Sequence, residues 1–264
     1  MYPERIICLA AEVPDILYRL GALDRVVGVS VYTRRPAQAL SLPKVSGFRH
    51  GRAAAILRHR PDLVILTSTV QGPLAAELAG HGVPLLHLFP HRLADLPQTI
   101  RLLGNVVNRP EQAEAVVADL ESTLEAVAEA AAALPAHPRV YFEEWMEPLV
   151  CGTGWVSDLI ELAGGRDVFR DRAISGRRAD DRRVDPGEVL RHDPDIIIAS
   201  WCGKPLEPEV VQRRPGWDGL TALRRQRLIE WAPDILQCGP DLAMTARQLQ
   251  GLMADVARDL AGEP

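Results

Sequence analysis

The chain has 264 residues, enough to bury one large core or two cores of ordinary domain size. Apolar residues make up 47% and charged residues 25%, a balance typical of globular proteins. A formal net charge of -5 argues against a nucleic-acid partner, because such proteins usually carry a basic surface. No apolar run is long enough to cross a bilayer, so we also expect no membrane insertion.

The first residues lead directly into an apolar run at 6–10, which predicts a buried strand. They lack the basic segment, apolar segment and small-residue cleavage site of a secretory signal. We therefore expect a cytoplasmic protein if Met1 is native, and a periplasmic one if a signal peptide was trimmed.

Apolar runs alternate with helical patterns through the first part of the chain, which predicts β-α repeats around a parallel sheet. The expected strands are 6–10, 25–31, 62–66 and 83–88, with a short amphipathic helix at 74–81 that ends before Gly82.

A long helix is predicted from Pro110 to Leu134, where Ala and Glu dominate and no Gly or internal Pro occurs. At about 1.5 Å per residue it would exceed 30 Å, enough to bridge two lobes. The pattern then restarts, with strands at 139–143, 195–200 and 228–231 and helices at 155–163 and 242–260. The sequence thus predicts an α/β protein of two Rossmann-like lobes with central parallel sheets, covering 1–108 and 137–264, joined by one long backbone helix at 109–136.

The four cysteines, Cys8, Cys151, Cys202 and Cys238, are widely separated and form no C-x-x-C pair. This spacing favours buried or half-buried thiols over a disulfide framework or a zinc site. We expect no metal site formed by the protein and no intrinsic cofactor.

In open α/β lobes, ligands bind beyond the carboxyl ends of the strands, so the residues that follow each predicted strand are the candidates. Aromatic side chains there offer broad apolar contact to a flat or bulky ligand. The candidate ligand-binding residues are Tyr32, Phe48, Ser68, Gln71 and His91 in the first lobe, and Glu143, Glu144, Trp145, Trp155, Trp201, Cys202, Lys204 and Gln237 in the second. Phe89, which follows the strand predicted at 83–88, is a further strand-end aromatic.

Glu143 and Glu144 have two readings, ligand contact or a salt bridge between loops, and alternation along a strand lets only one of them reach the cleft. The stretch 172–183 alternates Arg with Asp and is interpreted as a solvated loop. Enzyme motifs such as G-x-S-x-G, Walker A and H-E-x-x-H are absent, so we expect no catalytic residue. An enzyme that uses Glu143 or Glu144 with Cys202 and Lys204 is a remaining alternative.

Several blocks resemble the cobalamin-binding and siderophore-binding proteins of type III ABC importers, a family of receptors with a helical backbone. The blocks that carry this resemblance are 25–30 (RVVGVS), 43–48 (PKVSGF), 60–65 (RPDLVI), 158–169 (DLIELAGGRDVF) and 189–195 (VLRHDPD). It implies a binding protein rather than an enzyme, with cobalamin or a related corrinoid or metal chelate as the ligand in the cleft between the lobes. The alternative is an importer receptor for a siderophore or heme-like ligand whose signal was removed.

The resemblance also places an aromatic residue at Tyr32, a Phe in place of Trp at Phe48, and Thr67 where a third aromatic is expected. Family members dock on their ABC permease through one carboxylate on each lobe. Those positions fall at Ala54 and Gly187 here, which argues against permease docking because neither side chain carries a charge. The sequence also resembles a signal-less branch of the family, through the blocks 140–145 (VYFEEW) and 199–204 (ASWCGK).

Overall fold

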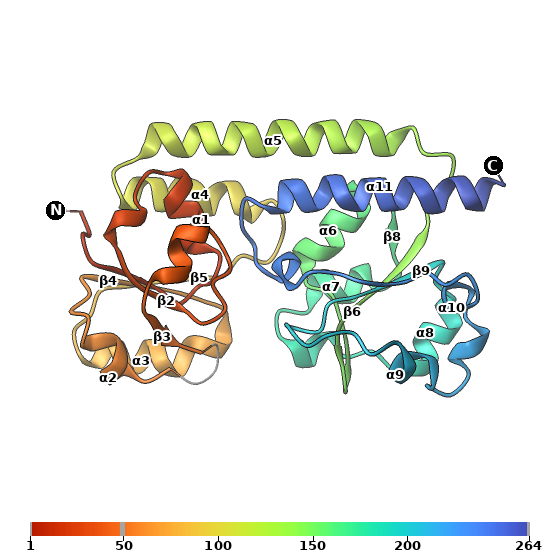
Figure 1. Ribbon diagram of the computed structural model, residues 1–264, viewed down its shortest axis with the longest axis horizontal. Helices are drawn as coiled ribbons and strands as arrows, with labels where there is room; N and C mark the ends of the chain where they lie inside the picture. Colours follow the sequence, from red (N-terminus) through yellow and green to blue (C-terminus); the bar gives the residue numbers. More distant parts are fainter. Residues whose placement is uncertain (1, 48–50, 263–264) are drawn as a thin grey trace. The chain divides into compact units, whose positions relative to one another are not determined.

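A computed structural model describes residues 2–47 and 51–262, and in it the chain forms two compact units (Figure 1). Unit 1 comprises Met1–Pro90, Ala94–Leu120 and Gln237–Pro240, and unit 2 comprises His91–Leu93, Glu121–Leu236 and Asp241–Pro264. The division falls inside the long helix α5 (Pro110–Ala132), so this helix contributes residues to both units. Two short segments also belong to the unit opposite to the one their chain position suggests.

Unit 1 is built on a five-stranded sheet, sheet A, in which every pairing is parallel. Its order in space is β3-β2-β1-β4-β5. The strands are β1 (Ile6–Cys8), β2 (Val26–Ser30), β3 (Lys44–Ser46), β4 (Leu63–Thr67) and β5 (Leu85–Leu88). Because the chain starts at the central strand and winds outward in both directions, the point where the winding reverses lies between β1 and β4.

Helices cover both faces of sheet A, α1 and α4 on one side and α2 and α3 on the other (Figure 1). They are α1 (Val13–Arg19), α2 (Ala53–Leu57), α3 (Gly72–Gly80) and α4 (Asp95–Val106), with 3₁₀ turns η1 (Leu23–Arg25), η2 (Ala37–Ser41) and η3 (Thr69–Gln71). Alternate strand residues such as Ile7 and Leu9 pack on Ile56 of α2 and Leu78 of α3. Burial of both faces explains why these strands are almost entirely apolar.

Unit 2 contains sheet B, of order β10-β9-β6-β7, with β8 paired to the start of β6. Its strands are β6 (Arg139–Met146), β7 (Leu149–Cys151), β8 (Arg166–Asp167), β9 (Ile196–Ala199) and β10 (Leu228–Glu230). All pairings are parallel except the one between β6 and β7, which form an antiparallel hairpin.

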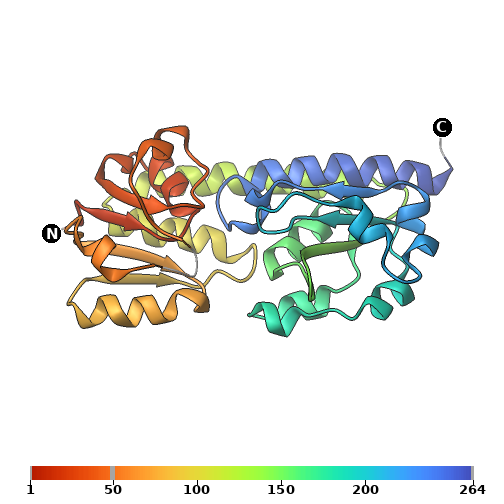
Figure 2. The ribbon, with the colours of Figure 1, turned by 60° about the horizontal axis from the view of Figure 1, so that its bottom comes forward.

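The helices of unit 2 are α6 (Gly154–Leu162), α7 (Arg170–Ser175), α8 (Pro186–His192), α9 (Pro208–Gln212), α10 (Thr221–Arg224) and α11 (Leu242–Ala261), with turns η4 (Ala179–Arg182), η5 (Trp217–Gly219) and η6 (Pro233–Leu236). α11 and α8 lie on opposite sides of sheet B (Figure 2). On the α8 side, Tyr141 meets Trp217 edge-to-face, with ring centroids 6.2 Å apart. This aromatic contact anchors the core beneath the carboxyl end of β6.

The same local backbone arrangement precedes β4 in unit 1 and β9 in unit 2. Arg60 and Asp193 have positive φ angles of 47° and 39°, and each is followed by Pro and Asp. The carboxylate of Asp62 accepts hydrogen bonds from the backbone N–H groups of Glu4 and Arg5, and that of Asp195 accepts one from the N–H of Arg139. Each Asp therefore ties the start of its strand to the neighbouring strand.

The predicted architecture, two α/β lobes with parallel sheets and one long helix, is confirmed. Each predicted strand and helix is present, with ends shifted by a few residues. α1, α4, the edge strand β3 and the β6–β7 hairpin were not predicted from the sequence. None of the helices formed by the described residues combines the length and apolar character required to span a bilayer.

Candidate functional site

Four exposed apolar side chains lie at the carboxyl edge of sheet A. Val31 and Tyr32 follow β2, Val70 lies in η3 after β4, and Phe89 follows β5. Their exposed fractions are 52%, 47%, 39% and 49%. We call this group the apolar rim. Since exposed apolar residues gathered in one region mark a binding surface more often than scattered ones do, this edge is the candidate site of unit 1.

Gln71 lies at the point where the winding of sheet A reverses, and it is 2% exposed. Its Nε2 donates to the carbonyl of Leu9 after β1 at 3.2 Å, and its Oε1 accepts from the N–H of Thr67 in β4 at 2.9 Å. Both hydrogen bonds are to the backbone, so this amide fixes the spacing of the two strand ends. No polar atom of Gln71 is left exposed for a ligand in this conformation.

Ser68, the next residue along, has a φ of 59° and a ψ of 162°, a region that residues other than glycine rarely adopt. Its hydroxyl accepts from the N–H of Val70 at 3.3 Å, and its carbonyl accepts from His87 Nε2 at 2.8 Å. The His87 ring in turn stacks against Phe89, with centroids 4.3 Å apart. This chain of contacts holds the apolar rim in place at β4 and β5.

Glu12 lies after β1 at the same edge and is 7% exposed. Gly239 packs on it so closely that a Cβ added there would be 3.2 Å from the Glu12 Cβ. Burial raises the pKa of Glu12 to about 7, against a smaller lowering by a backbone hydrogen bond. Among residues 2–47 and 51–262, no Arg or Lys forms an ion pair with it, so unit 1 carries a buried carboxylate without a counter-charge.

Glu143 lies at the carboxyl end of β6 in unit 2 and is fully buried. Arg214 donates to its two oxygens at 2.6 and 2.9 Å, and the indole Nε1 of Trp201 donates to Oε1 at 2.9 Å. The Arg214 guanidinium also lies 4.5 Å from the ring centroid of Trp217. Of the two readings of Glu143, the structure therefore shows the salt bridge, and it leaves this carboxylate no exposed atom.

Glu144 points the other way and pairs with Arg182, whose side chain is only 5% exposed. The Arg182 Nη1 is 2.5 Å from Glu144 Oε2 and 2.5 Å from the carbonyl of Cys151. Burial alone would lower the pKa of Arg182, but the Glu144 carboxylate outweighs it and raises that pKa. The prediction that 172–183 is a solvated loop is wrong in two respects: α7 and η4 occupy much of this stretch, and Arg182 is buried because it pairs with the half-buried Glu144.

β9 continues into a tight two-residue turn. Lys204 N donates to the carbonyl of Trp201 at 2.9 Å, and Cys202 and Gly203 between them have φ angles of 48° and 93°. Positive φ at both central residues is the hallmark of a type I′ turn. The turn brings Lys204 Nζ to 4.8 Å from the ring centroid of Trp145. It also places the exposed Cys202, whose Sγ lies 3.7 Å from the carbonyl of Glu144.

The remaining predicted residues are held by backbone contacts. Trp155 is half-buried and donates its indole N–H to Ile235 O at 3.0 Å, and His91 Nε2 donates to Ile174 O at 2.5 Å. Gln237 Nε2 donates to Tyr32 O at 3.1 Å, which joins it to the apolar rim. Phe48 lies outside the described residues. For the candidates with exposed atoms, direct ligand contact stays a prediction.

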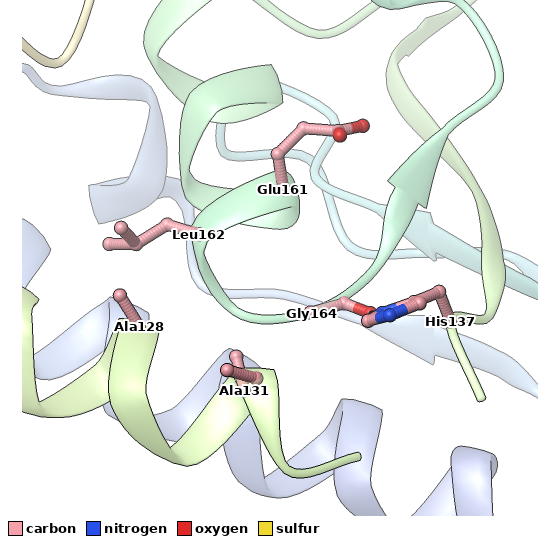
Figure 3. Close-up of a pocket in the computed structure, with 7 residues that line it drawn as sticks. Ala128, Ala131, His137, Glu161, Leu162 and Gly164 are labelled. Carbon is pink, nitrogen blue, oxygen red and sulfur yellow. The ribbon is translucent and has the colours of Figure 1, made fainter. Parts of the chain in front are cut away.

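A separate pocket of about 240 Å³ lies near the amino end of β6, away from the carboxyl edge of sheet B (Figure 3). Ala128 and Ala131 of α5 face Leu162 of α6 in this pocket, and Glu161 turns its carboxylate away from them (Figure 3). That carboxylate accepts from Asp167 N at 2.8 Å. None of the predicted site residues lines this pocket.

Within the described part of the chain, no three His, Cys, Asp or Glu side chains come together as a metal-binding group. Cys8, Cys151 and Cys238 are buried, Cys202 is exposed, and the four form no disulfide. The arginines that pair with the two glutamates, Arg182 and Arg214, were not predicted as site residues. Two members of the apolar rim, Val31 and Val70, were not predicted either. A strand-end position was a usable signal for Val31, but no sequence signal links Arg214 to Glu143.

The sequence matches the family model described as periplasmic binding protein over residues 6–235. A vitamin B12-binding protein of Pectobacterium atrosepticum is 28% identical over 204 residues, which cover 74% of this chain and 71% of that protein. A vitamin B12-binding protein of Vibrio campbellii is also 28% identical, over 202 residues that cover 75% and 70% of the two chains.

Solved structures agree with these sequence matches. The periplasmic heme-binding protein RhuT from Roseiflexus sp. superposes with a TM-score of 0.82 at 25% identity and covers 96% of this chain and 99% of its own. The periplasmic vitamin B12-binding protein BtuF of Vibrio cholerae gives a TM-score of 0.78 at 23% identity, with 97% and 98% covered, a likeness of fold. The family match spans most of the chain, so this protein belongs to the periplasmic binding protein family.

Proposed function

We propose that this small-molecule binding protein takes a flat, bulky macrocycle, a corrinoid or a related metal chelate such as heme, beyond the carboxyl ends of its sheet strands. The observation that carries the proposal is the apolar rim, Val31, Tyr32, Val70 and Phe89, exposed on one edge of sheet A. A macrocycle buries a wide apolar face, and such a face needs exposed apolar and aromatic side chains in the free protein. The relatives named for vitamin B12 and heme support the same ligand class.

No catalytic step belongs to this function. The enzyme alternative required Glu143 or Glu144 to act on a substrate, and arginines neutralise both carboxylates. A base or nucleophile must present an atom within reach of the substrate, and Glu143 presents none.

A periplasmic setting is the one that the relatives' names favour, since the names of RhuT and BtuF include the word periplasmic. The two expected docking positions, Ala54 of α2 and Gly187 of α8, carry no charge. We therefore propose a ligand-binding role that does not depend on paired docking carboxylates. Fractionation of cells that express the gene from its natural start codon would separate a periplasmic receptor from a cytoplasmic binder.

Titration tests the ligand class. Purified protein is mixed with cyanocobalamin, dicyanocobinamide and heme, and Trp fluorescence and ligand absorbance are followed. Phe89→Ser should weaken binding about tenfold, because one rim aromatic is lost. Tyr18→Ser is the matched control: Tyr18 is 45% exposed but lies near the end of α1, away from the strand carboxyl ends. No binding of any of the three compounds at tens of micromolar would refute the proposal.

A further inference from the structure

The Lys204 ammonium is held in a defined position at the carboxyl edge of sheet B. The type I′ turn closes with the hydrogen bond from Lys204 N to Trp201 O. Trp201 is 2% exposed, and its indole is bonded to the buried Glu143. The backbone that carries Lys204 is thereby tied to the core of unit 2, so this lysine is less free than one on a mobile loop.

Trp145 determines where the ammonium lies. Its indole N–H donates to the carbonyl of Glu147 at 2.9 Å, which fixes the ring, and Lys204 Nζ lies 4.8 Å from the ring centroid. A cation–π contact attracts the positive charge but accepts no hydrogen bond in the way an oxygen does. The N–H donors of Lys204 are therefore still available to a ligand.

The neighbouring carboxylates already have ion-pair or hydrogen-bond partners. Arg214 neutralises Glu143, Arg182 neutralises Glu144, and Glu230 accepts from Leu206 N at 2.9 Å. Within the ranges 2–47 and 51–262, no carboxylate lies at ion-pair distance from Lys204 Nζ. This edge therefore presents one positive charge without a protein partner beside a half-buried aromatic ring.

We infer that the Trp145–Lys204 pair is a subsite for an oxyanion, a carboxylate or a phosphate, carried by the ligand. The inference rests on the proposed function and adds to it the charge of the ligand. An oxyanion would take the unused N–H donors as charge-assisted hydrogen bonds, while the flat part of the ligand lies against aromatic surface. In the other interpretation Lys204 only shields Trp145 from water.

The composition of the chain makes this lysine easy to follow. Lys44 and Lys204 are the two lysines, and the rest of the 30 Lys and Arg residues are arginines. Lys44 begins β3 in unit 1, at the amino edge of sheet A, and donates to Ala39 O at 3.2 Å. Reductive methylation with ¹³C-formaldehyde keeps both charges and gives one dimethyl-lysine signal for each, which Lys44→Arg and Lys204→Arg assign. Lys44 is thus an internal control in the same sample.

Two ligand pairs test the subsite and separate the two oxyanions. Heme carries two carboxylates and its dimethyl ester carries none, while cyanocobalamin carries a phosphodiester that dicyanocobinamide lacks. In one of the two pairs, we expect the compound that carries the oxyanion to shift the Lys204 signal and to leave the Lys44 signal unchanged. Lys204→Met nearly keeps the length of the side chain but removes its charge. It should lower the affinity for that compound about tenfold and leave the affinity for the other member of the pair unchanged.

Equal affinity of both members of each pair, together with an unmoved Lys204 signal, would overturn the subsite while the proposed function stands. Failure of all four compounds to bind the unmodified protein would overturn both. A larger loss of affinity in Lys44→Met than in Lys204→Met would also contradict the assignment.

Discussion

The strands β4 and β9 occupy equivalent places in the two units, and they begin alike but end differently. Each begins after a residue with positive φ, a proline and an aspartate that bonds to the neighbouring strand. A non-glycine residue with positive φ follows each strand, Ser68 directly after β4 and Cys202 three residues after the end of β9. Beyond these residues the chemistry diverges, to neutral hydrogen bonds and apolar side chains in unit 1 and to ion pairs and a lysine in unit 2.

The starts of the two strands and the residues that follow them therefore meet different physical requirements. The residues at the start of each strand have to give buried backbone groups a hydrogen-bond partner, and the same Pro-Asp arrangement does this in both units. The residues that follow the two strands are not bound by this requirement, and their side chains differ between the units. Unit 1 presents exposed apolar side chains there, and unit 2 presents the Trp145–Lys204 pair.

The ion pairs of unit 2 give the largest expected effect. Arg214→Met leaves Glu143 buried without a counter-charge, and loss of one partner of a buried pair costs about 3–5 kcal/mol. Urea denaturation followed by Trp fluorescence measures the free energy of unfolding. The double variant Glu143→Gln with Arg214→Met removes both charges and keeps an acceptor for Trp201, so it should recover most of the loss. An equal loss in both variants would show that packing of Arg214 on Trp217, rather than charge balance, stabilises this edge.

Glu12 in unit 1 is the opposite case, a buried carboxylate that has no arginine partner among the described residues. Burial raises the pKa of Glu12 to about 7, above its unfolded value of about 4.3. The native state therefore holds a proton that the unfolded state has lost between these pH values, and stability falls as pH rises from about 4.3 to 7. Glu12→Gln removes this penalty and should raise the free energy of unfolding by about 1–3 kcal/mol at pH 8.5, with little change at pH 4. The same gain at both pH values would refute the titration of Glu12.

The Gln71 amide of unit 1, which bonds to two backbone groups, should stabilise the fold less than the ion pairs of unit 2 do. Gln71→Leu leaves Leu9 O and Thr67 N without partners, which costs about 1–3 kcal/mol for buried backbone groups. Gln112→Leu, at an exposed position of α5, is the control and should change stability little. If Gln71→Leu were as stable as the control, the strand ends of β1 and β4 would not depend on this amide.

The turn of unit 2 gives the smallest effect. Cys202 has a φ of 48°, which costs a non-glycine residue about 1–2 kcal/mol. Cys202→Gly should therefore unfold at a slightly higher urea concentration, and Cys202→Val at a lower one because branching at Cβ worsens the clash. Identical midpoints for the two variants would mean that the turn relaxes to another conformation.

The fold was predictable because its signals are local. Runs such as Ile196–Ala199 read as buried strands without knowledge of their neighbours, and the Pro-Asp pairs mark strand starts. β3 and β7 were missed because their apolar patterns are short: β3 has one apolar residue, Val45, and β7 has three between Pro148 and Gly152. The equally short β1 was found because it begins the longer apolar run 6–10. The candidate site was only partly predictable. Position after a strand found Tyr32, Trp145 and Lys204, but the pairing of Glu143 with Arg214 joins residues 71 apart in the chain.

The burial of three cysteines makes the fourth a natural attachment point for a probe. Burial raises the pKa of Cys151 to about 12 and that of Cys8 further still, so neither thiol forms the reactive thiolate near neutral pH. Cys238 is buried as well, whereas Cys202 is exposed. A maleimide dye should therefore label the native protein at Cys202, two residues from Lys204. Ligand arrival at this edge could then be followed by fluorescence without any engineered cysteine.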